Sequence, residues 1–196
     1  MIHKSDNHSL IFQSGKFWSY SNIGYYHLRI LIKKTCNLSL NEALDTLIFK
    51  PLDITDVMLA NKKEDLNQCH YVRENYHPNW LSHGMIIGSL ISAYLFLNHL
   101  SQGNIINDKS LKIMQELYEL NFDIGDRPWE KPAYALGLMI DNRSDDKYSY
   151  GHTGMGPDSV IAVYHFPKLN PAQTLAVIMN TEDQGLVEHK VHQLID

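Results

Sequence analysis

Much of the chain between about positions 20 and 125 follows the spacing of α-helices. Apolar residues recur every three to four positions after residues 20–22, which predicts a helix that begins just after them and ends near Asn37. Ser39 and Glu42 form a capping-box pattern, so a second helix is expected there, and Pro51 should end it. This half of the chain is therefore expected to be mostly helical.

A long apolar run occupies positions 84–100 and is hydrophobic on nearly all sides. Such a run is typical of a buried helix, which Gly103 should end. Asp108 has the character of a cap for a further helix that runs through Leu120. The polar, irregular stretch 61–83 before the run predicts a long surface excursion.

From position 133 onward, short β-rich runs replace the helical spacing. Runs 133–140 and 148–152 flank the polar "DNRSDDK" and predict a hairpin, and runs 159–166 and 174–180 predict two more strands. A final amphipathic helix is expected with its apolar face formed by Val187, Val191, Leu194 and Ile195. Helices followed by antiparallel strands predict an α+β fold: an antiparallel sheet flanked by helices, with a mostly helical subdomain. Residues 1–196 are expected to form one domain, mostly helical over about 20–125 and strand-rich over about 130–196.

Composition narrows the function classes. The 196 residues carry a formal net charge of −5 and are 44% hydrophobic, which disfavours disorder and nucleic-acid binding. Two cysteines without a CxxC pair signal neither a disulfide scaffold nor a thiolate zinc site. Among the eleven histidines no HExxH occurs, and His70, His77 and His83 are irregularly spaced, so no metal and no cofactor is expected.

The chain shows no membrane or export signal. The opening "MIHKSDNHSL" lacks a secretory apolar core, and no run approaches the ~18 apolar residues that span a bilayer. As written, the chain is expected to be cytoplasmic. If a lost amino-terminal segment carried a signal, a periplasmic or secreted location is expected instead.

Two short motifs carry candidate chemistry. Tyr20-Ser21-Asn22 stands at the start of a predicted helix, and "GHTGMG" at 151–156 stands between two predicted strands. A phenol near a cation can act as a general base, and an imidazole can donate or accept a proton. Each motif alone is more often structural, as a helix cap or as a turn. Their joint occurrence in this order favours a catalytic site.

Together the motifs resemble the serine β-lactamases of class C and their relatives, the penicillin-binding D-Ala carboxypeptidases, D-aminopeptidases and esterases. Tyr20-Ser21-Asn22 matches the Tyr-x-Asn of the class C branch, and 152–154 match the His-Thr-Gly that often replaces Lys-Thr-Gly in the esterase-like and peptidase-like members. The stretches "SGKFWSYSNIGYYHL", "SLNEALDTLIFKPLDITDVMLA", "YALGLMI" and "YGHTGMGPDSV" are similar as well. The similarity runs from about Phe12 to the carboxyl terminus.

The resemblance implies roles for five residues of the motifs, and the lack of a side chain gives Gly154 a sixth. Tyr20 would be the general base for a serine nucleophile and the acid for the leaving group, and Asn22 would orient the substrate's acyl side chain. His152 would take the electrostatic role of the family's lysine, and Thr153 would contact the substrate's carboxylate or backbone. Gly154 would let a ligand approach the strand closely, and the N–H of Met155 would form half of an oxyanion hole.

The family's Ser-x-x-Lys, which supplies the nucleophile, does not occur before Tyr20. One formal match, Ser144-Asp145-Asp146-Lys147, lies in the polar hairpin and is read as a surface turn. Ser21 has no obvious activating neighbour, and its hydroxyl is read as part of a turn. The resemblance therefore implies a domain shortened at its amino-terminal end.

Three hypotheses follow. The first is a β-lactamase-related serine hydrolase, acting on a β-lactam, a D-amino-acid peptide or an ester, that is inactive as this chain. The second is a non-catalytic module that keeps the cleft and binds a small-molecule or peptide ligand, a second copy, or a chain carrying Ser-x-x-Lys. The third is a metal-dependent hydrolase, which stoichiometric zinc in the purified protein would favour.

Overall fold

The computed structural model describes residues 12–13, 15–71 and 74–195. Its helices are α1 (Asn22–Cys36), α2 (Leu40–Leu44), α3 (Leu90–Ser101), α4 (Asp108–Met114) and α5 (Gln184–Gln193). Helical turns of other types cover Asp45–Phe49, Lys50–Leu52, Lys63–Gln68 and Pro78–Trp80. The strands are β1 (Met58–Ala60), β2 (Met85–Ile87), β3 (Tyr118–Glu119), β4 (Pro132–Tyr134), β5 (Met139–Asp141), β6 (Ser149–Gly156), β7 (Ser159–Phe166) and β8 (Gln173–Met179).

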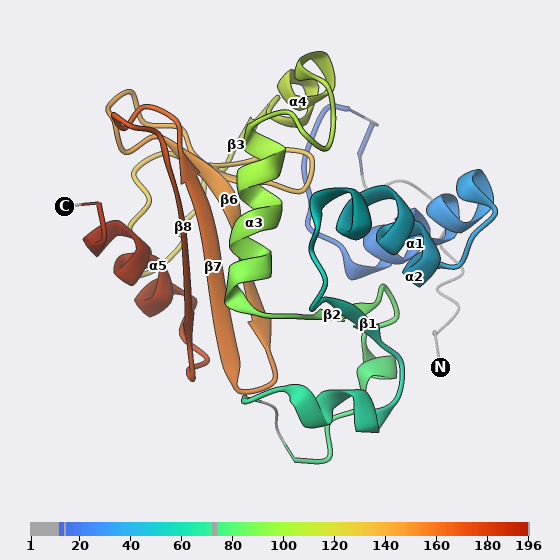
Figure 1. The fold of residues 1–196 in the computed structure, drawn as a ribbon. Coiled ribbons are helices and arrows are strands. Elements are labelled where there is room, and N and C mark those ends of the chain that lie inside the picture. The colour runs from blue at the N-terminus through green and yellow to red at the C-terminus, as the bar shows by residue number, and fades with distance from the viewer. Residues whose placement is uncertain (1–11, 14, 72–73, 196) are drawn as a thin grey trace.

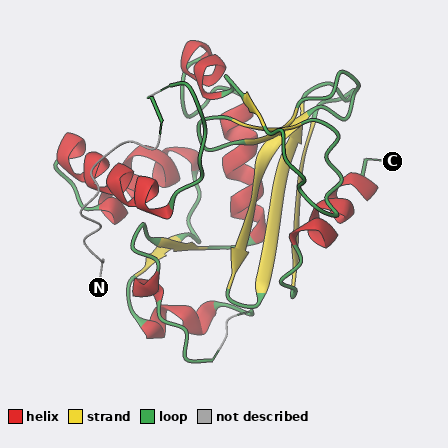
Figure 2. Cartoon of the chain, turned by 180° about the vertical axis from the view of Figure 1, so that it is seen from behind, coloured by secondary structure: helices red, strands yellow, loops and turns green. Residues whose placement is uncertain are grey.

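The centre of the fold is an antiparallel sheet of six strands in the order β3-β4-β5-β6-β7-β8. Every strand pairs with its neighbour along the chain, so the sheet is a simple meander. Strands β1 and β2 form a separate two-stranded sheet. Helix α5 covers one face of the large sheet and α3 covers the other, while α1 and α2 lie beyond α3 on the side away from α5 (Figure 1; Figure 2). The predicted α+β class is confirmed.

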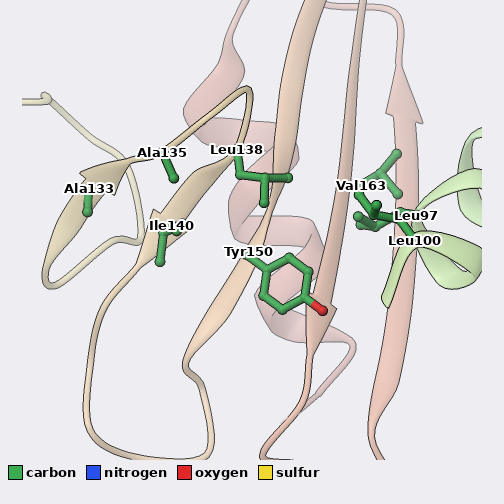
Figure 3. Packing of buried hydrophobic residues seen from close by; sticks show 8 residues of the cluster. All are labelled: Leu97, Leu100, Ala133, Ala135, Leu138, Ile140, Tyr150 and Val163. Atoms are coloured by element: carbon green, nitrogen blue, oxygen red, sulfur yellow. The ribbon is translucent and has the colours of Figure 1, made fainter. Parts of the chain in front are cut away.

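The alternation of side chains along β7 builds two cores, one on each face of the sheet. Val160, Ala162, Tyr164 and Phe166 point to one face and pack with Val187 and Val191 of α5. Val163 points to the other face and packs with Leu97 and Leu100 of α3 (Figure 3). The two faces therefore bury different sets of side chains, and this decides where each residue of β6 can act.

Two helix starts form as their sequences predict. The Ser21 hydroxyl accepts the Gly24 N–H at 3.1 Å and caps α1. The capping box of α2 is complete, because Ser39 and Glu42 each bond the other's backbone N–H. In the described part of the chain, no helix has the length and apolar character that crossing a bilayer requires.

The apolar run 84–100 departs from the prediction of one buried helix. Its first part is strand β2, and α3 begins only at Leu90, capped by the hydroxyl of Ser89. Ile91 on α3 is largely exposed, so the helix is not buried all round. A run that is apolar everywhere carries no period, and the cap at Ser89 is the local signal that separates strand from helix.

Three boundaries also differ from expectation. Helix α4 is capped by Asn107 rather than Asp108 and ends at Met114, well before Leu120. The run 133–140 is not one strand, because a turn at Gly137, with φ of +76°, folds it into the β4–β5 hairpin. Leu194 follows the last turn of α5 and is exposed, whereas Val187 and Val191 are fully buried.

Candidate active site

Strand β6 carries His152, and the imidazole contacts the side chain of Tyr134 from β4. The Tyr134 hydroxyl lies 3.1 Å from His152 Nε2, and the Tyr25 hydroxyl of α1 lies 3.0 Å from the Tyr134 hydroxyl. These contacts join α1, β4 and β6, whose residues are far apart in the sequence. Tyr134 therefore links helix α1 to the strand that carries the predicted His-Thr-Gly motif.

The contacts of His152 fix the direction of this hydrogen-bond chain. Its Nδ1 lies 2.8 Å from the Thr153 carbonyl oxygen, which can only accept, so Nδ1 carries the proton. In the neutral imidazole Nε2 is then an acceptor, and the Tyr134 hydroxyl donates to it. The Tyr134 oxygen in turn accepts from Tyr25. Burial lowers the pKa of His152 and raises that of Tyr134, so both groups are neutral near pH 7.

Tyr20 approaches the same tyrosine from the other side. Its ring centroid lies 6.4 Å from that of Tyr134, edge to face, and 5.6 Å from that of Tyr25. The imidazole of His152 lies 6.0 Å from Tyr134 in a similar edge arrangement. The two predicted catalytic residues thus share a neighbour, although 132 positions separate them.

The environment of Tyr20 favours its protonated form. Burial, and then the neighbouring phenol of Tyr25, raise the pKa of Tyr20. The general-base role that the sequence predicts for Tyr20 depends on a nearby cation, which would shift the pKa the other way. The phenol is therefore protonated near pH 7, and its action as a base stays a prediction.

Asn22 is the first residue of α1, directly after the capping Ser21, and is exposed. Its amide is therefore open to a ligand, and its substrate-orienting role stays a prediction. Ser21 is held as a cap by its bond to Gly24, which agrees with its reading as a structural hydroxyl.

Thr153 lies on the opposite face of the sheet from His152, because successive side chains of a strand alternate. Its side chain is 2% exposed, and its hydroxyl contacts Glu188 of α5 and lies 2.7 Å from the Tyr164 hydroxyl. The predicted contact between this hydroxyl and a substrate is not available in this arrangement. The sequence placed His152 and Thr153 in one cleft, and the pleat of the strand separates them.

Glu188 is the centre of a buried polar network on that face. Arg127 Nε donates to its carboxylate at 2.7 Å, Trp129 Nε1 donates at 2.9 Å, and Arg127 Nη2 makes a second ion-pair contact. The Arg127 guanidinium also stands 5.1 Å from the centre of the Trp129 ring. A buried carboxylate held by several donors is stable only while its partners remain. The network therefore ties α5 to β6 and to the loop before β4.

Gly154 and Met155 lie on a stretch of β6 that β5 does not reach. Strand β5 pairs only with residues 149–151, whereas β7 pairs with β6 along 150–156. A Cβ at Gly154 would meet only a side-chain methyl of Ile161, at 3.6 Å, so the backbone here is open to close approach. This supports the predicted roles of Gly154 and of the Met155 N–H, and both stay predictions.

The structure agrees with the non-catalytic interpretation of the other candidate motifs. Ser144 and both aspartates of the formal Ser-x-x-Lys are exposed in the turn between β5 and β6. Lys168 Nζ donates to the Ser144 carbonyl oxygen at 3.0 Å, which holds the turn. Among the described residues, no three His, Cys, Asp or Glu side chains are grouped as a metal ion would need.

Tyr134, Arg127 and Glu188 were not selected from the sequence. Tyr134 lies in a run that reads as an ordinary buried strand. Glu188 had a weak local signal, as a charged residue beside Val187 on the buried face of the last helix. Arg127 had no local signal, because its role depends on the Glu188 carboxylate, which is 61 positions away.

A protein-family model described as Beta-lactamase matches residues 1–192 of the chain. No curated protein sequence matches significantly. The resemblance drawn from the two motifs is thereby confirmed at the level of the family.

Solved structures with the same fold include three of particular interest. D-stereospecific amidohydrolase from Streptomyces sp. is 20% identical with a TM-score of 0.72, covering 93% of this chain and 55% of that one. D-amino acid amidase from Ochrobactrum anthropi SV3 is 19% identical with a TM-score of 0.76, covering 92% and 58%. The octameric penicillin-binding protein homologue from Pyrococcus abyssi is 17% identical with a TM-score of 0.71, covering 92% and 43%. The chain thus spans less than two thirds of each of these proteins, and the likeness is one of fold.

The buried His152 predicts a dependence of stability on pH. An unfolded chain protonates this imidazole near pH 6.5, but the folded protein, whose His152 pKa is lowered, does so only at lower pH. Between these values the unfolded state binds more protons, so the free energy of unfolding falls as the pH is lowered from about 7.5 through 6.5. Replacing His152 with Gln should reduce this slope by at most about 1.4 kcal/mol per pH unit, the limit for one proton.

Urea unfolding at a series of pH values measures the slope. His70→Gln, which changes an exposed histidine, is the matched control and should leave the slope as in the parent protein. Among the described residues, burial also lowers the pKa of His83, His165 and His192, and these histidines contribute to the slope that remains. An unchanged slope in His152→Gln would show that the imidazole is as accessible to protons in the folded state as in the unfolded one.

Proposed function

Because the chain belongs to the beta-lactamase family, we propose that it carries the tyrosine and histidine part of a site for acyl transfer to serine followed by hydrolysis. The substrate class is a β-lactam, a D-amino-acid peptide or amide, or an ester. The observation that carries the proposal is the position of Tyr134, which contacts His152 and lies against Tyr20. Two similar structures are named D-stereospecific amidohydrolase and D-amino acid amidase, which supports the inclusion of D-amino-acid amides.

Each group has a role that its surroundings support. The Tyr20 phenol, which its raised pKa keeps protonated, transfers a proton to the leaving group as negative charge develops there. The exposed Asn22 amide orients the acyl side chain of the substrate. The Met155 N–H, on the stretch of β6 that β5 leaves open, donates to the developing oxyanion. His152 acts as a neutral imidazole that orders Tyr134 and Tyr25, rather than as a stand-in for a lysine cation.

The nucleophile has no counterpart among these 196 residues. The single Ser-x-x-Lys match, at 144–147, lies in an exposed turn, and the Ser21 hydroxyl is engaged as a helix cap. Loss of the nucleophile in a serine hydrolase leaves only ~10³–10⁴-fold catalysis over water, from binding and oxyanion donors. We therefore propose that these residues alone form no acyl-enzyme.

This proposal predicts that the purified chain gains no mass when it is incubated with a penicillin-type β-lactam or a fluorophosphonate. Intact-mass spectrometry makes the measurement, and peptide mapping locates any adduct. Ser21→Ala and Ser144→Ala variants are the controls, because they remove the two hydroxyls nearest to a motif. A stoichiometric adduct on Ser21 or Ser144 that disappears in the matching variant would overturn the proposed inactivity.

A second candidate function is a partner-binding module, and the surface of α1 favours it. Helix α1 contains no buried residue, and Ile23, Leu28 and Leu31 are exposed by 64%, 51% and 57%. Leu28 and Leu31 are three positions apart and so lie on the same side of the helix. Apolar surface of this kind is a common mark of a contact with another chain.

Sedimentation velocity tests this second candidate. The chain, at 22.6 kDa, should sediment as a species larger than the monomer at micromolar concentration, and the double variant Leu28→Glu, Leu31→Glu should sediment as a monomer. Ile91→Glu alters an equally exposed apolar residue on α3 and should leave the association unchanged. A parent chain that remains a well-folded monomer over a hundredfold range of concentration would speak against self-association through α1.

A further inference from the structure

Helix α1 carries the start of the candidate site, because Tyr20 directly precedes its capping residue and Asn22 is its first residue. None of its 15 residues is buried. The helix packs against α2, and its contacts with the six-stranded sheet are few. Helices in proteins are stabilised mainly by packing an apolar face, but in α1 Leu28 and Leu31 are largely exposed. Contacts of another kind must therefore hold α1 in place.

The sequence of α1 favours a helix only weakly. Isolated helices shorter than ~12–15 residues are marginal in water even when they are rich in alanine. Helix α1 contains no alanine, and Gly24 near its start and the isoleucines and tyrosines further along lower its helix propensity. The stability of the helix therefore depends on the contacts that dock it.

Two hydrogen bonds dock α1, and both come from one side of the helix. The Tyr25 hydroxyl donates to the Tyr134 hydroxyl of β4 at 3.0 Å, and Arg29 Nη1 donates to the Ser82 carbonyl oxygen at 3.1 Å. Tyr25 and Arg29 are four positions apart and are therefore neighbours on the helix surface. One bond reaches the large sheet, and the other reaches the loop before β2.

Tyr134 is the point on the sheet to which α1 and the segment before it are attached. The ring centroids of Trp18 and Tyr20 lie 4.8 and 6.4 Å from that of Tyr134. Its hydroxyl accepts from Tyr25 and donates to His152. Tyr20 therefore lies close to His152 only while α1 and this segment are docked on Tyr134.

We propose that α1 opens from the sheet as a unit, at a cost well below that of global unfolding, and that the two hydrogen bonds are the latch that keeps it closed. Opening carries Tyr20 and Asn22 away from His152, so Tyr25 and Arg29 are positioning residues. Within the proposed function, on which this last step rests, the candidate site is complete only in the closed form. The opening itself requires no substrate and no nucleophile.

Native-state hydrogen exchange measures the opening residue by residue. Amides 28–32 of α1 should show protection factors at least about a hundredfold smaller than amides 161–165 of β7, a strand that contributes to both cores. Tyr25→Phe keeps the ring and removes the hydroxyl. It should speed exchange at 28–32 by about three- to tenfold, the effect of losing one hydrogen bond, and leave β7 unchanged. Tyr26→Phe is the matched control, because the Tyr26 ring lies against His27 of the same helix, and should change neither element.

Arg29→Gln tests the second bond of the latch. It should speed exchange in α1 by a similar factor, and in combination with Tyr25→Phe the two factors should multiply, because the two bonds reach separate partners. The same combined factor at each of the amides 28–32 is expected if α1 opens as one unit. A combined factor no larger than that of Tyr25→Phe alone would exclude the Arg29 bond from the latch.

Three results would overturn the proposal as a whole. Equal protection in α1 and β7 would mean that α1 opens only when the entire fold does. Faster exchange in both elements of Tyr25→Phe would assign to this hydroxyl a role in global stability alone. Equal effects of Tyr25→Phe and Tyr26→Phe would show that the bond to Tyr134 does not hold the helix.

The measurement separates the latch from the functions proposed above. A second copy bound to α1 would also protect its amides, so exchange is measured again in the Leu28→Glu, Leu31→Glu background. The effect of Tyr25→Phe should persist there, and its loss would assign the protection to association and overturn the latch. A β-lactam adduct on the parent chain would overturn only the proposed inactivity, so the two proposals fail separately.

Discussion

The buried carboxylate of Glu188 is the constraint on which the rest of the strand-rich half depends. It is 1% exposed and receives donors from Arg127 and Trp129 of the loop before β4 and from Thr153 of β6. A carboxylate so far from water is tolerated only when its lone pairs are filled by well-placed donors. One side chain of α5 therefore sets how the helix, the sheet and the loop before β4 lie against one another.

Because side chains alternate along β6, the contact with Glu188 also sets the direction of the neighbouring side chain. Thr153 is held toward α5 by Glu188, so the side chain of its neighbour His152 leaves the strand on the other side, and the Tyr134 hydroxyl contacts its imidazole. The imidazole then lies at the junction of the sheet with α1, within one tyrosine of Tyr20. The same alternation explains why the two side chains of one motif serve different purposes. Thr153 secures the strand, and His152 orders the phenols.

The sequence predicted what depends on local pattern. The β-rich run 159–166 is a strand with those same bounds, and Ser21 and Ser39 cap helices because their chemistry is local. The centre of the site could not be predicted in this way. The roles of Tyr134 and Glu188 depend on contacts with residues 18 to 109 positions away, and a local sequence pattern cannot predict such contacts. The family resemblance selected the strand that carries His152 and Thr153, but not which face of the strand each side chain occupies.

The free energy of unfolding of a Glu188→Ala variant tests this account most directly. Urea titration should show a loss of about 3–5 kcal/mol, because the change leaves the Arg127 cation, which is mostly buried, without its partner. Glu64→Ala, at an exposed glutamate, should change the value by less than about 0.5 kcal/mol. A loss below about 1 kcal/mol in Glu188→Ala would contradict the account, since the carboxylate would then not hold α5, β6 and the loop before β4 together.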